Sequence, residues 1–101
     1  MEFSSDIKRD SIIISLEGEL DEKTAGKTRE YLDKRIRDSG CEKVILDFSK
    51  VGFMDSTGIG VLLGRYKMIT ERGGQLCVSN VNAQIDKVFR ISGLYQIIKA
   101  V

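Results

Sequence analysis

Apolar residues recur with two different periods along this chain, and each change of period marks a predicted element. Residues 11–17 (SIIISLE) are rich in isoleucine and predict a strand. The weaker segment 3–8 (FSSDIK) predicts a partner strand, joined to it in a hairpin through residues 9–10. Residues 22–38 then show helical spacing. The buried stripe expected for this helix consists of Ala25, Thr28, Leu32 and Ile36.

The second half of the chain repeats the alternation of strand and helix. Residues 43–48 (KVILDF) and 75–80 (QLCVSN) predict strands, and residues 56–72 and 82–92 predict helices. The tail 95–101 (YQIIKAV) is short and apolar, which predicts a last strand or an ordered extension. The side chains expected to face inward from these two helices are Ile59, Leu62, Leu63, Tyr66, Ile69, Ile85, Val88, Phe89 and Ile91. The expected helix stops are Gly40, Gly73, Gly74 and Gly93.

The order of these elements predicts an α/β fold. Strands that alternate with helices imply parallel crossovers, and the first hairpin adds an antiparallel pair, so the sheet is expected to be mixed. Helices should cover at least one of its faces. With 101 residues and no linker or repeat, residues 1–101 are expected to form one domain.

Composition and charge exclude several kinds of partner. The formal net charge is +1, from 16 basic and 15 acidic residues, which lacks the basic excess that phosphate backbones select. We therefore expect no nucleic acid and no acidic membrane surface as a partner. No stretch has the apolar length of a membrane span, and the charged start MEFSSDIKRD lacks the apolar core of a signal peptide, so we expect a cytoplasmic protein.

The absence of histidine narrows the chemistry further. The chain contains none, which removes Ser-His-Asp and Cys-His catalysis. Cys41 and Cys77 have neither CxxC spacing nor a metal signature, and we interpret them as small side chains in a reducing compartment. We expect no metal, no cofactor and no catalytic residue.

The most unusual stretch is FMDSTGIGVLLGRYK, residues 53–67, where a strand passes into a helix. It places the polar Asp55, Ser56 and Thr57 at the junction and then puts glycines 58, 60 and 64 inside the helix. Each glycine in a helix interior costs about 1 kcal/mol relative to alanine. An N-terminal cap explains one polar residue here, but it leaves the glycines unexplained.

Three functional interpretations compete with the cap. A phosphate-binding glycine loop is weakly supported, because the glycines lie inside the helix and no GK[ST] follows. A nucleophilic serine is nearly excluded, because G-x-S-x-G and a histidine base are both absent. A regulatory phosphoserine at Ser56 fits better, since a phosphate suits the helix dipole. Gly58 and Gly60 would then keep the first turn bare for another protein, and Gly64 would allow close packing on the sheet.

The same stretch resembles a known family. Together with GELD at 18–21 and FRISGL at 89–94, it is similar to the anti-sigma factor antagonists, which carry the STAS domain. The resemblance covers nearly the whole chain in order, and GRYK at 64–67 leans toward the sporulation-type antagonist. It implies a small mixed sheet with helices mainly on one face. Relatives commonly continue past the SGL segment into a further helix, whereas this sequence ends at Val101.

The resemblance also implies a non-enzymatic switch. The unphosphorylated family member binds an anti-sigma factor that is also a serine kinase, and so releases a sigma factor. The kinase phosphorylates the motif serine, here Ser56, and a serine phosphatase resets it. The partner surface implied for this chain consists of Asp21, Asp55, Ser56, Thr57, Gly58, Ile59 and Gly60.

The roles of some residues, and the choice between functions, stay open at this point. Asp21 is as well explained by a cap on the first long helix, for which Thr24 competes, as by partner binding. Arg65 and Lys67 either form a solvated helix face, the simpler interpretation, or pair with an acidic partner. One alternative function is a STAS-type sensor or interaction domain that binds a nucleotide or other anion at the helix start without phosphorylation. Another is a domain of this fold detached from a transporter or sensor, in which Ser56 is only a helix cap. We expect a monomer.

Overall fold

The strands and helices follow one another in the predicted order. The computed structural model describes all 101 residues. Its strands are β1 (Glu2–Lys8), β2 (Ser11–Leu20), β3 (Lys43–Met54), β4 (Gln75–Ser79) and β5 (Lys99–Ala100). Its helices are α1 (Ala25–Ser39), α2 (Ser56–Glu71) and α3 (Ala83–Ser92), with a 3-10 turn at Leu94–Gln96. None of these helices combines the length and the apolar character needed to cross a membrane.

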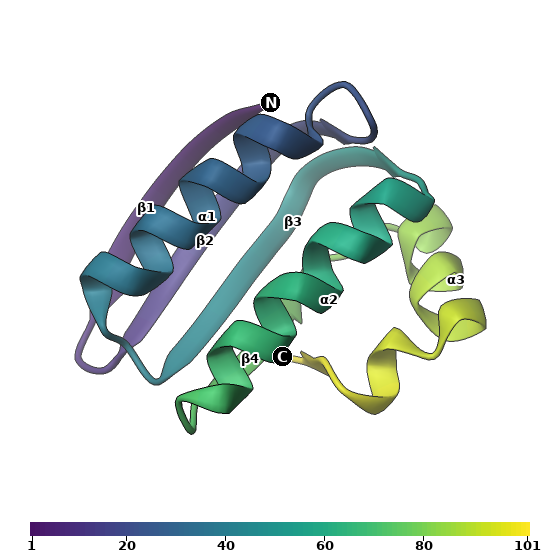
Figure 1. Cartoon of the computed structure of the whole chain (residues 1–101). Helices are drawn as coiled ribbons and strands as arrows, with labels where there is room; N and C mark the ends of the chain where they lie inside the picture. Colours follow the sequence, from purple (N-terminus) through teal and green to yellow (C-terminus); the bar gives the residue numbers. More distant parts are fainter.

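The five strands form one mixed sheet in the order β1-β2-β3-β4-β5 (Figure 1). β1 runs antiparallel to β2 through the predicted hairpin, where Arg9 adopts a positive φ of 59°. The pairs β2–β3, β3–β4 and β4–β5 are parallel. The tail therefore supplies a short last strand, one of the two outcomes that the sequence left open.

The helices cover one face of the sheet. β2 alternates buried and half-buried residues, so Ile12, Ile14 and Leu16 join the core while Ile13 faces the opposite side. α3 lies on the same face as the core, because the ring of its Phe89 packs edge-on against Phe48 of β3, with centroids 5.9 Å apart. This arrangement confirms the mixed sheet with helices on one side. The other face of the sheet carries no helix.

The stripe expected on α1 is confirmed in full. Ala25, Thr28, Leu32 and Ile36 are its buried residues. The helix ends at Gly40, whose φ of 62° is in the left-handed region that glycine adopts most easily. It starts at residue 25 rather than 22, because residues 22–24 form a separate turn before it.

Three expectations on packing are wrong. Leu63 and Ile91, expected to face inward, are exposed to 43% and 77%. On α2, Val61 is buried although it was not expected to be, and Leu63 is not. Gly64 meets no atom within 4 Å at its missing Cβ, so close packing on the sheet does not explain it.

The strand β3 is also longer than predicted, since it continues from residue 48 to Met54. Its register with β2 shifts twice in this extension, between Ser15 and Glu17 and between Gly18 and Glu19. Such bulges break the two-residue period on which sequence prediction depends. The extension has a functional consequence, because it carries the chain directly to the start of α2.

Candidate partner-binding site at the start of helix α2

The ends of β2 and β3 bring two predicted site residues together. These strands are parallel, and Leu20 pairs with Met54 at the last position of each. The carbonyl oxygen of Leu20 accepts a hydrogen bond of 3.3 Å from the main-chain N–H of Asp55. Asp21 and Ser56 therefore follow two paired strand ends, which confirms that they are neighbours, as expected for one edge of a parallel sheet.

Asp55 caps α2. Its Oδ1 accepts hydrogen bonds from the main-chain N–H groups of Thr57 (2.9 Å) and Gly58 (3.2 Å). Its backbone is extended, as is usual for a residue just before a helix. Such a cap contributes about 1 kcal/mol, and it leaves Oδ2 of Asp55 without a hydrogen bond. The capping function at this junction thus belongs to Asp55.

Ser56 has no structural task of its own. It is the first residue of α2, its side chain is exposed, and its hydroxyl takes part in no hydrogen bond. Thr57, the next hydroxyl residue, is half-buried.

The two glycines of the first turn differ. Gly58 is buried, and a Cβ at this position would lie 2.5 Å from Cγ of Met54 and 2.9 Å from the carbonyl oxygen of Leu20. The expectation that Gly58 keeps the surface open for a partner is therefore wrong, because it allows α2 to pack on the strand ends. Gly60 is exposed and meets no atom within 4 Å, so it does leave the helix surface bare.

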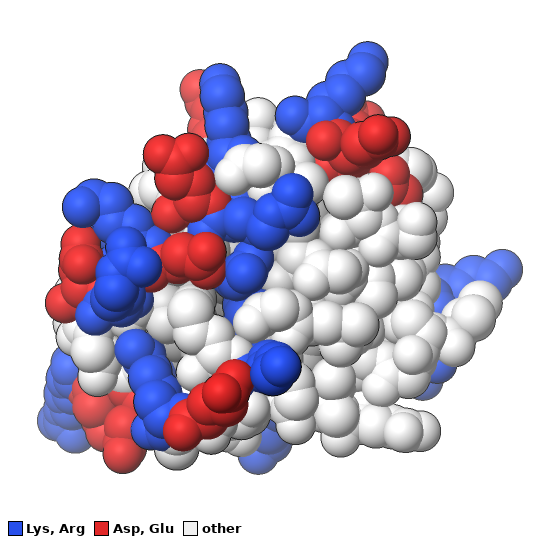
Figure 2. Space-filling view, viewed as in Figure 1, with Lys and Arg blue, Asp and Glu red and all other residues white.

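An exposed stripe of α2 starts at Ser56. Gly60 and Leu63 follow it at the i+4 and i+7 positions, which lie on the same side of a helix, and both are exposed. Figure 2 shows charged side chains crowded over the half of this view that α1 occupies, whereas the half with α2 and α3 is mostly uncharged. Leu63 was expected in the core from its apolar character, although its spacing of seven residues from Ser56 is the signal that would have put it on this stripe.

The neighbouring turn at 21–24 has its own network. Oδ1 of Asp21 accepts hydrogen bonds from the N–H groups of Lys23 (3.0 Å) and Thr24 (3.2 Å). The hydroxyl of Thr24 donates to the carbonyl oxygen of Glu19 (2.7 Å) and accepts from the N–H of Asp21 (3.1 Å). Asp21 thus caps this turn, while its Oδ2 has no hydrogen bond and no ion-pair partner.

The simpler interpretation, in which Arg65 belongs to a solvated helix face, is wrong. Its Nε lies 2.9 Å from Oδ1 of Asp33 on α1, and only 12% of its side chain is exposed. The pair joins α1 to α2, so Arg65 is used inside the molecule and is not available to an acidic partner. Lys67 on the same helix is exposed, as expected.

Ile59, in the first turn of α2, is half-buried and packs against the core. The candidate site therefore combines the exposed hydroxyl of Ser56 and the uncharged stripe that follows it with two carboxylates, those of Asp21 and Asp55, which each have one oxygen without a hydrogen bond. It lines no hollow of the surface.

Comparisons with known proteins identify the family of this chain. The family model of the STAS domain matches residues 2–101. An anti-sigma F factor antagonist from Paenibacillus polymyxa is 40% identical over 89 residues, covering 88% of this chain and 76% of the relative. An anti-sigma-B factor antagonist from Bacillus subtilis is 33% identical over 100 residues, covering 97% of this chain and 90% of the relative.

A solved structure shares the fold. It is that of the Bacillus cell fate determinant SpoIIAA in its phosphorylated form, with a TM-score of 0.74 and 29% identity. The match covers 99% of this chain and 91% of that one. The named relatives are regulatory proteins rather than enzymes. The chain belongs to the STAS-domain family and is similar to its anti-sigma factor antagonists.

Proposed function

We propose that this protein is an anti-sigma factor antagonist that is switched off by phosphorylation of Ser56. In its unphosphorylated form it binds an anti-sigma factor that is also a serine kinase, and thereby releases a sigma factor. A serine phosphatase resets it. The observation that carries the proposal is the exposed hydroxyl of Ser56, which has no hydrogen bond because Asp55 caps the helix.

The helix start can accept a phosphate without unfolding. A phosphoserine carries about −1.5 to −2 charges at neutral pH, and the positive end of the helix dipole favours negative charge. No hydrogen bond of the folded protein depends on the Ser56 hydroxyl, so its modification removes none. Phosphorylation is therefore expected to change the binding surface without destabilising the fold.

Release follows from the charge that the phosphate adds. The stripe of Ser56, Gly60 and Leu63 is uncharged, and a partner that packs on it must exclude water from it. A phosphate there would have to be desolvated, beside the unpaired Oδ2 of Asp55. We propose that this cost separates the partners.

The proposed partner surface includes the neighbouring turn. Oδ2 of Asp21 is free to accept a charge-assisted hydrogen bond from a basic group of the kinase. Thr57, Ile59 and Gly60 complete the contact, and Leu63 extends it along α2. Gly58 supports this surface from below through its packing, without touching the partner.

The phosphorylation test uses the anti-sigma factor of the same organism with ATP, and intact-mass measurement of this protein. The wild type is expected to gain one phosphate, Thr57→Ala likewise, and Ser56→Ala none. A Ser56→Ala protein that gains phosphate at Thr57 would contradict the assignment. Wild-type protein that binds the partner but is never phosphorylated would separate binding from the proposed switch.

The surface test uses Asp21→Asn. The amide oxygen of asparagine can accept the hydrogen bonds from Lys23 and Thr24, so the melting temperature is expected to stay nearly unchanged. The lost charge is expected to weaken the complex at least tenfold, or about 1.4 kcal/mol, by titration calorimetry. Equal affinity with lowered stability would leave Asp21 as a cap only.

A further inference from the structure

A second candidate site lies beside β5, the last strand at one side of the sheet. The strand β5 pairs only with β4, so its outer edge is free. A surface hollow of about 420 Å³ lies here, lined by residues of α3, of the segment 95–97 and of β5. It shares no residue with the start of α2 or with the turn at 21–24.

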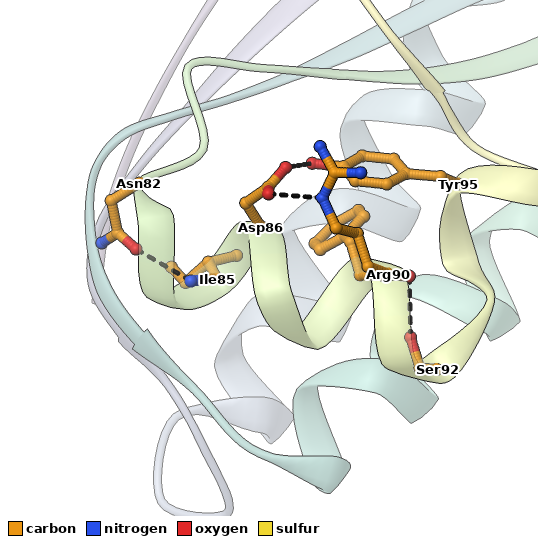
Figure 3. Close-up of polar contacts among 7 residues, drawn as sticks. Asn82, Ile85, Asp86, Arg90, Ser92 and Tyr95 are labelled. Carbon is orange, nitrogen blue, oxygen red and sulfur yellow. Dashed lines mark hydrogen bonds and ion pairs between the residues drawn. The ribbon is translucent and has the colours of Figure 1, made fainter.

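A guanidinium group on the wall of the hollow contacts two other side chains of the lining (Figure 3). Nε of Arg90 donates a 2.7 Å hydrogen bond to Oδ2 of Asp86, one turn earlier on α3. The hydroxyl of Tyr95 donates a 2.6 Å bond to the other oxygen, Oδ1. The guanidinium carbon of Arg90 lies 5.8 Å from the centre of the Tyr95 ring. These contacts orient the group before any ligand arrives.

The charges in the hollow leave a positive excess. The hydrogen bond from Arg90 holds the pKa of Asp86 below its usual range, so this carboxylate stays ionised at neutral pH and offsets Arg90. Burial, together with the bond to Asp86, raises the pKa of Tyr95 to about 12, so Tyr95 stays neutral. Lys99 also lines the hollow and forms no ion pair.

Both Nη groups of Arg90 remain unused by the protein. Its only hydrogen bond is made by Nε, and 70% of its side chain is exposed. A guanidinium that keeps two parallel N–H donors matches the two oxygens of a carboxylate. The rest of the lining includes apolar surface from Tyr95, Ile97 and Ala100, with Ile97 exposed to 38%.

We propose that this hollow binds a small organic acid, that is, a carboxylate carried on a compact apolar body. The carboxylate pairs with the Nη groups of Arg90 and with the ammonium group of Lys99. The apolar body covers the ring of Tyr95 and the side chain of Ile97. Small-molecule sites commonly combine an apolar lining with a few oriented polar groups in this way.

Titration with benzoate, followed by amide NMR shifts of the whole chain, tests the proposal. Benzoate is expected to shift the signals of Arg90, Ile97 and Lys99 in a saturable way, with a dissociation constant of about 1 mM or lower. Benzamide, which keeps the ring and removes the charge, is expected to bind at least tenfold more weakly, as is inorganic phosphate. A lack of saturation, or equal binding of benzamide, would overturn the proposal.

Substitutions locate the binding to this hollow. Arg90→Gln is expected to lose benzoate binding by at least tenfold, and Arg90→Lys, which keeps charge without the two parallel donors, by about fivefold. Lys99→Gln breaks no contact of the folded chain and is expected to lose about threefold. Lys87→Gln, an exposed residue of α3 outside the hollow, is the matched control and should change nothing. Undiminished binding by folded Lys99→Gln and Arg90→Lys would overturn the assignment.

Discussion

The starts of α1 and α2 are built from similar residues and use them differently. Each follows a strand of the parallel pair β2–β3. Asp55 at the start of α2 and Asp21 in the turn before α1 both accept main-chain hydrogen bonds with Oδ1 and leave Oδ2 free. In the turn before α1, the hydroxyl of Thr24 both donates and accepts hydrogen bonds. At the start of α2, the hydroxyl of Ser56 makes none.

The difference shows what makes a hydroxyl available for modification. Thr24 cannot be altered without breaking the turn that precedes α1, since its oxygen joins Glu19 to Asp21. Ser56 can be altered because Asp55 has already satisfied the main-chain N–H groups of the helix start. A helix start with both a cap and a separate exposed serine thus assigns stability to Asp55 and leaves Ser56 free for the regulation that we propose.

The largest effect is expected at the contact between the two starts. Gly58→Ala would place a methyl group 2.9 Å from the carbonyl oxygen of Leu20, which is backbone and cannot move alone. We expect the free energy of unfolding to fall by about 1–3 kcal/mol in urea denaturation. Gly60→Ala is the control, and as an exposed helix position it should raise stability by about 0.5–1 kcal/mol. Similar effects of both changes would contradict the tight contact.

The different contributions of the Thr24 and Ser56 hydroxyls to stability are tested by comparing Thr24→Val with Ser56→Ala. Valine keeps the shape of threonine and removes both hydrogen bonds, so we expect a loss of about 1.5 kcal/mol. Ser56→Ala should change the free energy of unfolding by less than about 0.5 kcal/mol, since it removes no bond. Denaturant titrations of the two proteins under one condition decide it, and a larger loss for Ser56→Ala would reverse the assignment of roles.

The cap on α2 is tested by Asp55→Ala. The N–H groups of Thr57 and Gly58 then lose their acceptor, and we expect a loss of about 1 kcal/mol in thermal or chemical unfolding. Asp55→Asn keeps an acceptor oxygen and is expected to lose less. If Asp55→Ala has no effect while Ser56→Ala destabilises, the serine is the cap.

A small gain in stability is expected from Ser56→Asp. A negative charge at the first residue of α2 meets the positive end of the helix dipole, which favours the fold by about 0.3–1 kcal/mol. The gain should shrink when salt is raised, because exposed charges are screened. Melting curves at low and high ionic strength measure it, and a clear loss of stability would show that the added charge is not tolerated there.

Much of the fold could be predicted because local patterns agree with packing. The stripe on α1 follows from the helical period of its apolar residues. The stops at Gly40 and Gly93 have φ values of 62° and 79°, a conformation that glycine favours, and glycine is recognised directly in a sequence. The extension of β3 to Met54 was missed because two bulges interrupt the alternation. Ile91 was misplaced because apolar character alone does not say which side of a short helix packs.

The position of the candidate site could be predicted, but the role of each of its residues could not. Two strand ends, each followed by a polar turn, identified the edge where Asp21 and Ser56 meet. Which of Asp55 and Ser56 caps depends on side-chain geometry, and the buried contact of Gly58 depends on the distance to Leu20. The pairing of Arg65 with Asp33 joins two helices far apart in sequence, which no local pattern reveals.

The hydrogen bond from the Asp55 amide to Leu20 has a consequence for exchange with deuterated solvent. This bond joins the residue that follows β3 to the last residue of β2. The Asp55 amide is therefore expected to exchange when these two strand ends separate. A protein that binds at either start resists that separation. Deuterium uptake at Asp55 is thus expected to slow on complex formation, even for a partner that contacts only the turn at 21–24.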